Sequence, residues 1–326
     1  MNVVLFVCSL GLLSVVQSLT SIPDFKVSDN AIAQLVNQMR DADAEKPQFC
    51  DITLNYQGYF NGRESVSYNL FKSIKPTLFK RPSFAKLLAL RKYFNPQTGV
   101  AEVQSQAKIQ AIKEFFETVW SSGPFKKLIE FVRAHSKSID LLVNKQIEST
   151  DHPWAKDPNT FRQAVMSIWF DTFSRAKGKL DSSGFEHVFL GEVKNQQVSG
   201  MHNWAVMADL ERSPTENFIY RGYLRKEFDV IAEVNLMWKG FEKPQGSFLA
   251  NSSPAFDFSL LTACFLARRG PGNKCFATID GCNIAVQSYE QAQNGKMFIG
   301  TVYPAIGRSS PTCQKNYNQR KTSCSL

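Results

Sequence analysis

The spacing of the apolar residues changes near Gly184, and this change constrains the fold more than any other feature of the chain. Before Gly184, apolar residues recur every three or four positions, as they do on one face of a helix. After it, short runs rich in β-branched and aromatic residues alternate with Gly, Asn and Asp, which is typical of strands joined by turns. The pattern predicts an α+β fold, with a helical N-terminal half followed by a sheet-rich half.

The first half contains several segments with helical spacing, and Ser28 stands before the first of them in the position of an N-cap. Prolines near the starts of other segments fit the first turn of a helix, where a missing N–H costs little. Helices are predicted after Ser28 and at residues 83–94, 108–120, 125–134 and 161–173. In the second half, strands are predicted at residues 185–189, 229–238, 276–279, 283–289 and 297–303, with one helix at about 254–266.

Residues 1–18 have no charged side chain and include an apolar run, so they are expected to form a signal peptide that directs secretion. No later apolar run is long enough to span a bilayer as a helix. We expect one domain over residues 19–306, divided into a helical part at about 24–180 and an α+β part at about 181–306. Residues 307–326 form a basic C-terminal tail, expected to be poorly ordered unless Cys313 and Cys324 close it.

The number of cysteines favours a protein located in an oxidising compartment. The chain has seven, and six remain once the signal peptide and its Cys8 are removed. An even number in a secreted protein predicts disulfide bonds, whose connectivity the sequence leaves open. The last four lie within residues 275–324, which favours local bridges there. The spacing of Cys and His does not match a zinc site.

The net charge of +9 and the isoelectric point of about 9.1 favour a polyanionic partner such as nucleic acid, a heparin-like glycan or an anionic membrane. The alternative is a secreted protein that is basic without such a partner. Residues 65–101 are rich in Lys and Arg, contain interleaved aromatic residues and have no acidic residue. Basic groups beside aromatic platforms favour binding of single-stranded RNA. The alternative is that these aromatic residues belong to the core and the lysines to a solvated face.

Two of the four histidines, His187 and His202, lie close together in the sequence. Because imidazole titrates near neutrality, such a pair supplies one base and one acid at the same pH. With a downstream lysine, the pair fits the cleavage of RNA by its own 2′-hydroxyl. One imidazole takes the hydroxyl proton, the other protonates the leaving oxygen, and the lysine neutralises charge on the phosphate. The alternative is that both histidines are structural.

Four motifs in a fixed order resemble the EndoU family of poly(U)-specific endoribonucleases of the secreted animal type. They lie at residues 182–192, 199–204, 238–247 and 299–304, and upstream segments at 81–85 and 95–102 are also similar to the family. The resemblance covers about residues 27–306. It implies an enzyme that cuts uridine-rich single-stranded RNA at uridylates and leaves 2′,3′-cyclic phosphate ends.

The family's catalytic residues fall on His187, His202 and Lys243, and the resemblance implies that His202 is the general base and His187 the general acid. Lys239 is the competing lysine. The family's uridine-reading serine falls on Ser247 and its aromatic platform on Tyr303. Thr301 is a neighbouring candidate for substrate binding.

The resemblance also implies Mn²⁺ or Ca²⁺ as a cofactor. Glu186 and Glu192 flank His187, and carboxylate oxygens are suitable ligands for such cations. The alternatives are that a carboxylate orients His187, or that a metal acts on folding or RNA binding. Ala255 replaces a glutamate that is common in the family, which puts a local salt bridge in doubt. Asn251 begins a glycosylation sequon close to Ser247, where a glycan would crowd the RNA.

Two rival functions remain open. One is a secreted RNA- or polyanion-binding protein without turnover, motivated by residues 65–101. The other is a metal-dependent hydrolase built on Glu186, His187 and Glu192. A monomer is expected in each case.

Overall fold

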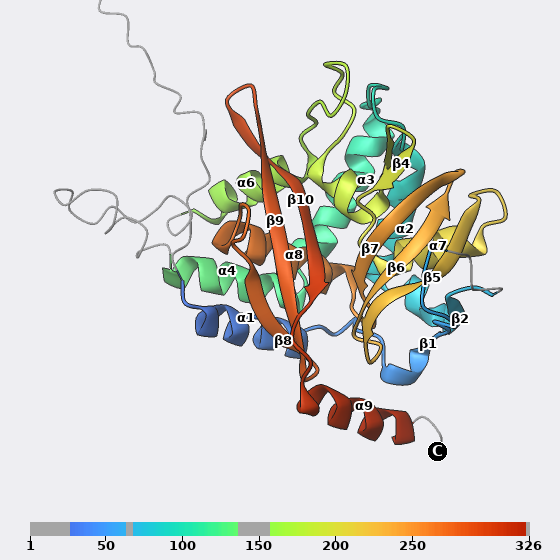
Figure 1. The fold of residues 1–326 in the computed structure, drawn as a ribbon. Helices are drawn as coiled ribbons and strands as arrows, with labels where there is room; N and C mark the ends of the chain where they lie inside the picture. The colour runs from blue at the N-terminus through green and yellow to red at the C-terminus, as the bar shows by residue number, and fades with distance from the viewer. Residues whose placement is uncertain (1–26, 63–67, 136–156, 324–326) are drawn as a thin grey trace, which may run out of the picture.

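The structure is a computed structural model that describes residues 27–62, 68–135 and 157–323 (Figure 1). Helices dominate its first half and sheets its second half, which confirms the predicted α+β fold. The predicted signal peptide, residues 1–18, lies outside the described residues. The helices are α1 (Asp29–Asp41), α2 (Pro82–Leu90), α3 (Gln106–Trp120), α4 (Gly123–His135), α6 (Pro158–Phe170), α7 (Trp204–Arg212), α8 (Pro254–Ala267) and α9 (Pro311–Ser323).

Two sheets of the second half carry most of the β-structure. One has five strands in the order β3-β4-β7-β6-β5, and the other has three in the order β10-β9-β8. Strand β10 contacts β7 and β6, so the two sheets meet along it. A small sheet pairs β1 with β2. The strands are β1 (Ile52–Leu54), β2 (Phe71–Ile74), β3 (Glu192–Lys194), β4 (Gln197–Ser199), β5 (Phe218–Glu227), β6 (Ile231–Trp238), β7 (Phe241–Leu249), β8 (Cys275–Ile279), β9 (Cys282–Gln293) and β10 (Lys296–Ile306).

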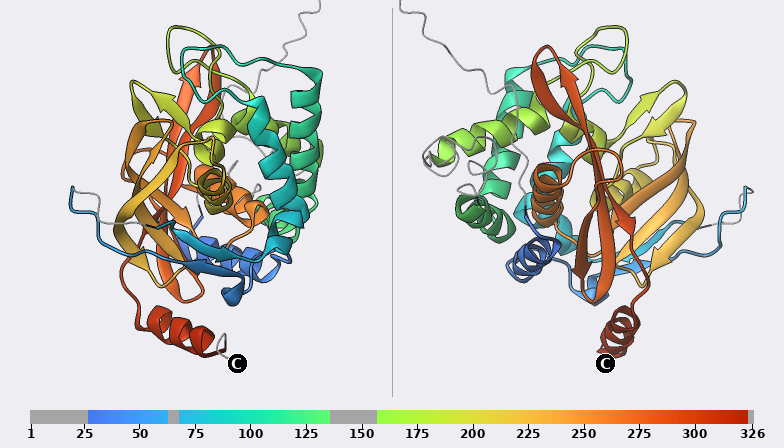
Figure 2. Two further views of the ribbon diagram at one scale, coloured as in Figure 1. Left: turned by 90° about the vertical axis from the view of Figure 1, so that its right-hand side faces the viewer. Right: turned by 60° about the vertical axis from the view of Figure 1, so that its left-hand side comes forward.

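Helix α8 forms the centre of the molecule. Its residues are mostly apolar and are buried from Pro254 to Leu266, as expected for a helix enclosed on all sides. It contacts α1, α3 and α4 on one side and β9 and β10 on the other. Figure 2 shows the resulting layers, with the helices of the first half covering one side of the sheets. Among the described residues, no helix combines the length and apolar character needed to cross a bilayer.

Local signals explain where the helices begin. The Ser28 hydroxyl accepts a hydrogen bond from the Ala31 N–H at 3.2 Å, which confirms the predicted N-cap of α1. Pro82, Pro158 and Pro254 occupy the first turns of α2, α6 and α8, where their missing N–H leaves no bond unmade.

The predicted strand at residues 185–189 is wrong, because Glu186–Leu190 form a π-helical turn. The turn is buried on all sides, with its apolar side chains in the core, so β-prone residues serve here as core residues of a helix. Gly191 ends the turn with φ +86°, a conformation that favours glycine.

The tail after Gly307 is ordered, because residues 311–323 form helix α9, and a bridge at Cys313 is part of the exception that the prediction allowed. A disulfide joins Cys313 to Cys282 on β9, and Arg320 pairs with Asp280 at 2.8 Å. A second disulfide joins Cys275 to Cys264, which lies outside the predicted local group of four. Cys50 is disulfide-bonded as well, and Cys324 lies outside the described residues.

Candidate active site

His187 is the second residue of the π-helical turn. The Ser183 hydroxyl accepts the Glu186 N–H at 3.2 Å, and the Gly191 N–H closes the turn on the Glu186 carbonyl at 2.9 Å. Turns of this kind are rare and occur frequently at functional sites. The His187 side chain is only 8% exposed, and its Nδ1 lies 2.9 Å from Glu192 Oε2. The turn therefore fixes the ring against a carboxylate.

Backbone hydrogen bonds bring His202 close to His187. The Met201 N–H donates to the His187 carbonyl at 2.9 Å, and the His202 N–H donates to the Val188 carbonyl at 2.7 Å. Gly200 makes this approach possible, because a Cβ there would lie 1.7 Å from the His187 carbonyl oxygen. Two segments that are separate in the sequence thus present their imidazoles side by side.

The two imidazole rings differ in the hydrogen-bond partner of their Nδ1 atoms. His202 Nδ1–H donates to the Ser247 carbonyl at 2.8 Å, which leaves Nε2 as an unprotonated acceptor. Burial, the Lys243 charge and the His187 charge hold the pKa of His202 well below its usual value. His187 faces the Glu192 carboxylate instead, which favours its charged form, although burial and Arg175 lower its pKa overall. The geometry therefore suits His202 to accept a proton and His187 to donate one.

Lys243 lies on β7 and is 4% exposed. Burial lowers the pKa of its ammonium group to about 8. Within the described part of the chain, no carboxylate forms an ion pair with Lys243. Lys239, by contrast, pairs with Glu216 at 3.3 Å and lies over the Trp238 ring. The structure thus favours Lys243 over Lys239 as the cation beside the histidines.

Glu192 and Arg175 form a support behind His187. The same carboxylate oxygen, Glu192 Oε2, lies 2.9 Å from His187 Nδ1 and 3.0 Å from Arg175 Nε. Arg175 Nε also donates to the Ser182 hydroxyl at 2.7 Å, and its Nη2 donates to the Gly300 carbonyl on β10. Sequence reasoning missed Arg175, because a single arginine in a loop carries no spacing signal.

The comparisons with known proteins decide the family. Residues 31–304 match the family described as endoribonuclease XendoU. The chain belongs to the XendoU endoribonuclease family. It is 31% identical to uridylate-specific endoribonuclease C of Xenopus laevis, over 85% of this chain and 89% of that protein. It is 29% identical to the human uridylate-specific endoribonuclease, over 85% of this chain and 66% of that protein.

A solved structure, titled as XendoU, a splicing-independent snoRNA processing endoribonuclease, is similar to this chain with a TM-score of 0.67. The two are 28% identical in sequence, and the match covers 85% of this chain and 97% of the other. The likeness spans the helical half and the sheets, so the XendoU fold extends over nearly all of the described residues.

Two of the three residues predicted to bind substrate, Ser247 and Tyr303, lie beside His202. Ser247 is on β7, and its hydroxyl lies 3.4 Å from His202 Nδ1. Tyr303 on β10 stacks on His202, with ring centroids 5.3 Å apart and an interplanar angle of 21°. Thr301 follows the β-bulge of β10 and is half-buried. The meeting line of the two sheets therefore gathers the residues that the XendoU resemblance selected.

Glu186 and Glu192 do not form a metal-ligand set in this geometry. Glu192 Oε2 is held by His187 and Arg175, and its Oε1 has no hydrogen-bond partner among the described residues. Glu186 is fully buried without a hydrogen-bond partner, and burial together with the Glu192 charge raises its pKa well above the usual value. No group of three or more His, Cys, Asp or Glu side chains suited to a metal occurs among the described residues. The arrangement instead matches the alternative in which Glu192 orients His187.

Two further sequence features have structural roles in the described residues. In the basic stretch, Phe71 and Phe84 are buried and pack against Trp204, the first residue of α7. Arg91 forms ion pairs with acidic residues of the second half. Asn251 of the sequon is 6% exposed, and its amide nitrogen donates to the Asp229 carbonyl at 3.0 Å. A glycan does not fit on that buried nitrogen.

Proposed function

We propose that this chain cleaves single-stranded RNA at uridylates by transfer of the phosphate to the 2′-hydroxyl, which leaves a 2′,3′-cyclic phosphate. One observation carries the proposal: two neighbouring imidazoles have opposite Nδ1 partners, a carbonyl for His202 and a carboxylate for His187. The names of the relatives support uridylate specificity.

The reaction proceeds by in-line displacement at phosphorus. His202 Nε2 accepts the 2′-hydroxyl proton while the O2′–P bond forms, and the P–O5′ bond breaks as His187 Nε2 donates its proton to O5′. The Lys243 ammonium faces the added charge on the non-bridging oxygens. Both protons are accounted for, so the reaction needs no external nucleophile, and DNA is inert because it lacks the 2′-hydroxyl.

Selectivity for uridine rests on Ser247 and Tyr303. The Tyr303 ring beside His202 supplies a flat surface for the uridine, and Thr301 adds a hydroxyl on the same strand. The Ser247 hydroxyl supplies a hydrogen-bonding partner for the uracil edge. A base with the wrong edge leaves these buried polar groups unpaired, which disfavours its transition state.

The test is cleavage of a fluorescent oligonucleotide with one ribouridine, with the products analysed by mass. His187→Ala, His202→Ala and Lys243→Ala are each expected to lower kcat/KM by ~10²-fold or more. Lys239→Ala is the matched control and is expected to retain activity. A His187→Ala protein that cleaves at the wild-type rate would refute the assignment.

The product analysis also separates the rival functions. Binding of the oligonucleotide without any product favours a secreted RNA- or polyanion-binding protein. Products with linear phosphate ends from the outset favour a metal-dependent hydrolase. Products that end in a cyclic phosphate, with the same mass for the wild type and for the Lys239→Ala control, support transphosphorylation.

We propose further that the protein is a secreted monomer and that Mn²⁺ or Ca²⁺ raises its activity from a position other than Glu186 and Glu192. Among the described residues no third ligand joins that pair, so we place a dependence on metal in folding or RNA binding. Thermal unfolding with and without each metal tests this independently of turnover. An unchanged melting temperature together with unchanged RNA affinity contradicts it.

A further inference from the structure

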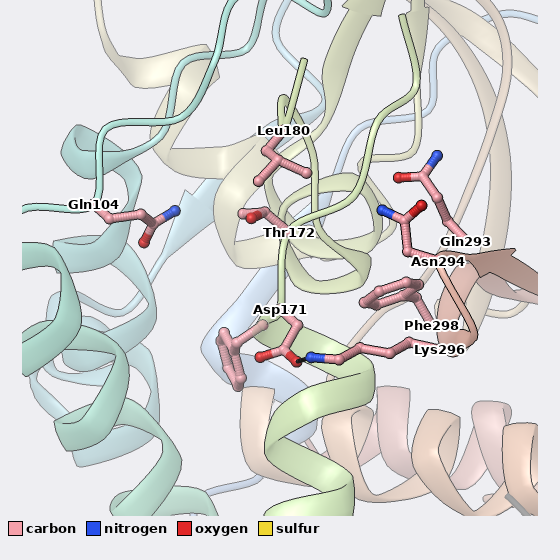
Figure 3. A pocket seen from close by; sticks show the side chains of 9 residues that line it. Gln104, Asp171, Thr172, Leu180, Gln293, Asn294, Lys296 and Phe298 are labelled. Atoms are coloured by element: carbon pink, nitrogen blue, oxygen red, sulfur yellow. Dashed lines mark hydrogen bonds and ion pairs between the residues drawn. The ribbon is translucent and has the colours of Figure 1, made fainter. Parts of the chain in front are cut away.

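A cavity of about 420 Å³ lies at the tip of the β9–β10 hairpin, away from the histidines (Figure 3). The hairpin contributes Asn294, Lys296 and Phe298, and the segment after α6 contributes Asp171 and Leu180 on the facing side. Figure 3 shows the amides of Gln104 and Asn294 directed into the cavity from opposite sides. The mechanism proposed above uses none of these residues.

The cavity and the uridine platform open from the same face of β10. The bulge between Ile299 and Thr301 makes Phe298, Thr301 and Tyr303 pair with Gln291, Tyr289 and Gln287, which are alternate residues of β9. These three side chains therefore share one face of β10. Ile299 and Val302 are fully buried in the core on the opposite face.

The separation fits a short stretch of RNA. From Gln287 to Gln291 the strand β9 advances four residues, or roughly 13 Å at ~3.3 Å per residue. A single strand covers this distance with about two to four nucleotides, because each advances ~3.4 Å when stacked and more when extended. One strand of RNA can therefore occupy Tyr303 and the cavity together.

The lining has the groups that a nucleotide needs. Gln104 and Asn294 are exposed, and neither amide has a hydrogen-bond partner in residues 27–62, 68–135 and 157–323, so each offers a donor and an acceptor to a base edge. Leu180 is 50% exposed and supplies an apolar surface for the base. These features are those with which proteins bind unstacked bases of RNA.

Charge at the rim suits the phosphates. The Lys296 ammonium lies 3.4 Å from the Asp171 carboxylate, and both side chains are largely exposed. Such exposed pairs are weak, so a phosphate competes for the lysine. Lys179 is exposed next to Leu180 and adds a second cation.

We propose that this cavity is a second nucleotide subsite, which binds a base of the same RNA strand about two to four nucleotides from the uridine held by Tyr303. The subsite rests on the proposed function, because it extends the RNA path from the cleavage site. Its effect is on the affinity for longer substrates and not on the chemical step.

The test compares a minimal uridylyl dinucleotide with oligonucleotides that carry one ribouridine and progressively longer deoxynucleotide flanks. For the wild type, kcat/KM is expected to rise once one flank reaches the cavity and then to level off. Gln104→Ala and Asn294→Ala are each expected to remove ~3- to 10-fold of this gain and to leave the dinucleotide rate unchanged. Lys296→Gln is expected to do the same and to weaken the salt dependence.

Lys315→Gln on α9 is the matched control, since it removes an exposed lysine at the other end of the hairpin (Figure 1). A wild-type rate that does not depend on flank length overturns the subsite, as does an equal loss on the dinucleotide. Unchanged rates of the variants on all substrates also overturn it, and then a protein or small molecule is the better occupant.

Failure of the proposed function gives a different result, because the wild type then cleaves neither substrate. Anisotropy of a labelled, fully deoxy oligonucleotide still measures the subsite in that case. Weaker binding by Asn294→Ala, but not by Lys315→Gln, supports the subsite, and equal binding by all proteins overturns it.

Discussion

At the scale of single residues, one difference in hydrogen bonding assigns two chemically identical rings to different tasks. The Ser247 carbonyl accepts the Nδ1–H of His202 and so leaves Nε2 free, while burial and the Lys243 charge favour the neutral ring. The Glu192 carboxylate at Nδ1 of His187 instead stabilises the charged form of that ring. Lys243 stands near both rings and lowers the pKa of each. The assignment of base and acid thus follows from the environment of each ring.

The pH dependence of kcat/KM follows from these shifts. The depressed pKa of His202 keeps the base unprotonated well into the acidic range. As the pH rises, activity is expected to fall first when His187 loses its proton, and again near pH 8, because the pKa of Lys243 is about 8 and its charge is then lost. Initial rates with a uridylyl dinucleotide between pH ~4.5 and ~9.5 measure both steps.

Lys243→Arg isolates the second fall, because arginine stays charged throughout this range. The fall near pH 8 is expected to vanish in this variant and to persist in the control Lys239→Arg. If the Lys243→Arg profile keeps that fall, the lysine is not the group that titrates there.

Arg175 is expected to position His187 through Glu192. Arg175→Met removes a charge that lowers the pKa of His187, so the first fall in kcat/KM moves to higher pH. It also frees the Gly300 carbonyl of β10, and we expect kcat/KM at the optimum to drop by ~10-fold. Arg175→Lys keeps the positive charge but lacks the planar guanidinium, so it is expected to lower kcat/KM without moving the pH profile. Identical profiles for wild type and Arg175→Met would count against this role.

How far the sequence predicts the site differs from residue to residue. His187, His202, Lys243 and Tyr303 were selected by motifs, and the structure brings all four together. The sequence did not identify Arg175, because its role arises from contacts with Glu192 and Gly300, and no local sequence pattern encodes these contacts. The metal role of Glu186 and Glu192 is implied by the family resemblance and by their carboxylates, which carry no information on their burial or on the contact of Glu192 with His187.

At the scale of elements, the close approach of two turns creates the site, and Gly200 permits it. Gly200→Ala would place a Cβ 1.7 Å from the His187 carbonyl oxygen at φ +68°, so the loop must move away from the π-helical turn. We expect ~10²-fold or greater loss of kcat/KM, because small misplacement of acid and base is costly. Single-turnover cleavage of the oligonucleotide measures the loss.

Gly270→Ala is the matched control, since Gly270 also has a positive φ, of +96°, but a Cβ there meets no atom within 4 Å. Backbone strain is similar in the two variants, and only Gly200→Ala adds the collision. Equal activities of the two would show that the approach of the turns is not needed.

Periodicity predicted the helices of the first half and strands β6, β8, β9 and β10, because their apolar faces are long and regular. It missed α7 and β5, and it missed β7, which contains Pro244 and Gly246. It also missed the π-helical turn, whose residues are strand formers held in the core. Helix α9 was missed for another reason. It has no apolar face and depends on Cys313 and on Asp280 for its place.

At the scale of the whole molecule, α9 lies outside residues 31–304, the part matched by the family, and below the body that holds the site (Figure 1). It is bonded to the hairpin between β8 and β9, and its Tyr317 ring also contacts Phe49 and Phe228. Asp280 there pairs with Arg320 of α9 and, at 2.8 Å, with Arg40 of α1. Helix α9 thus connects to the scaffold of the first half and not to the histidines.

We therefore expect the double variant Cys282→Ser/Cys313→Ser to lose stability without losing chemistry. Removal of this disulfide, whose sequence separation is 31 residues, is expected to cost about 2–4 kcal/mol. Thermal unfolding should show a Tm lower by roughly 3–7 °C, while kcat/KM on the dinucleotide at low temperature stays within about twofold of wild type. Arg320→Ala, which leaves the disulfide in place, is the milder control. A large loss of kcat/KM in the folded double variant would mean that strain at β9 reaches Tyr303 through its pairing with β10, and that the C-terminal helix sets the active site as well as the stability.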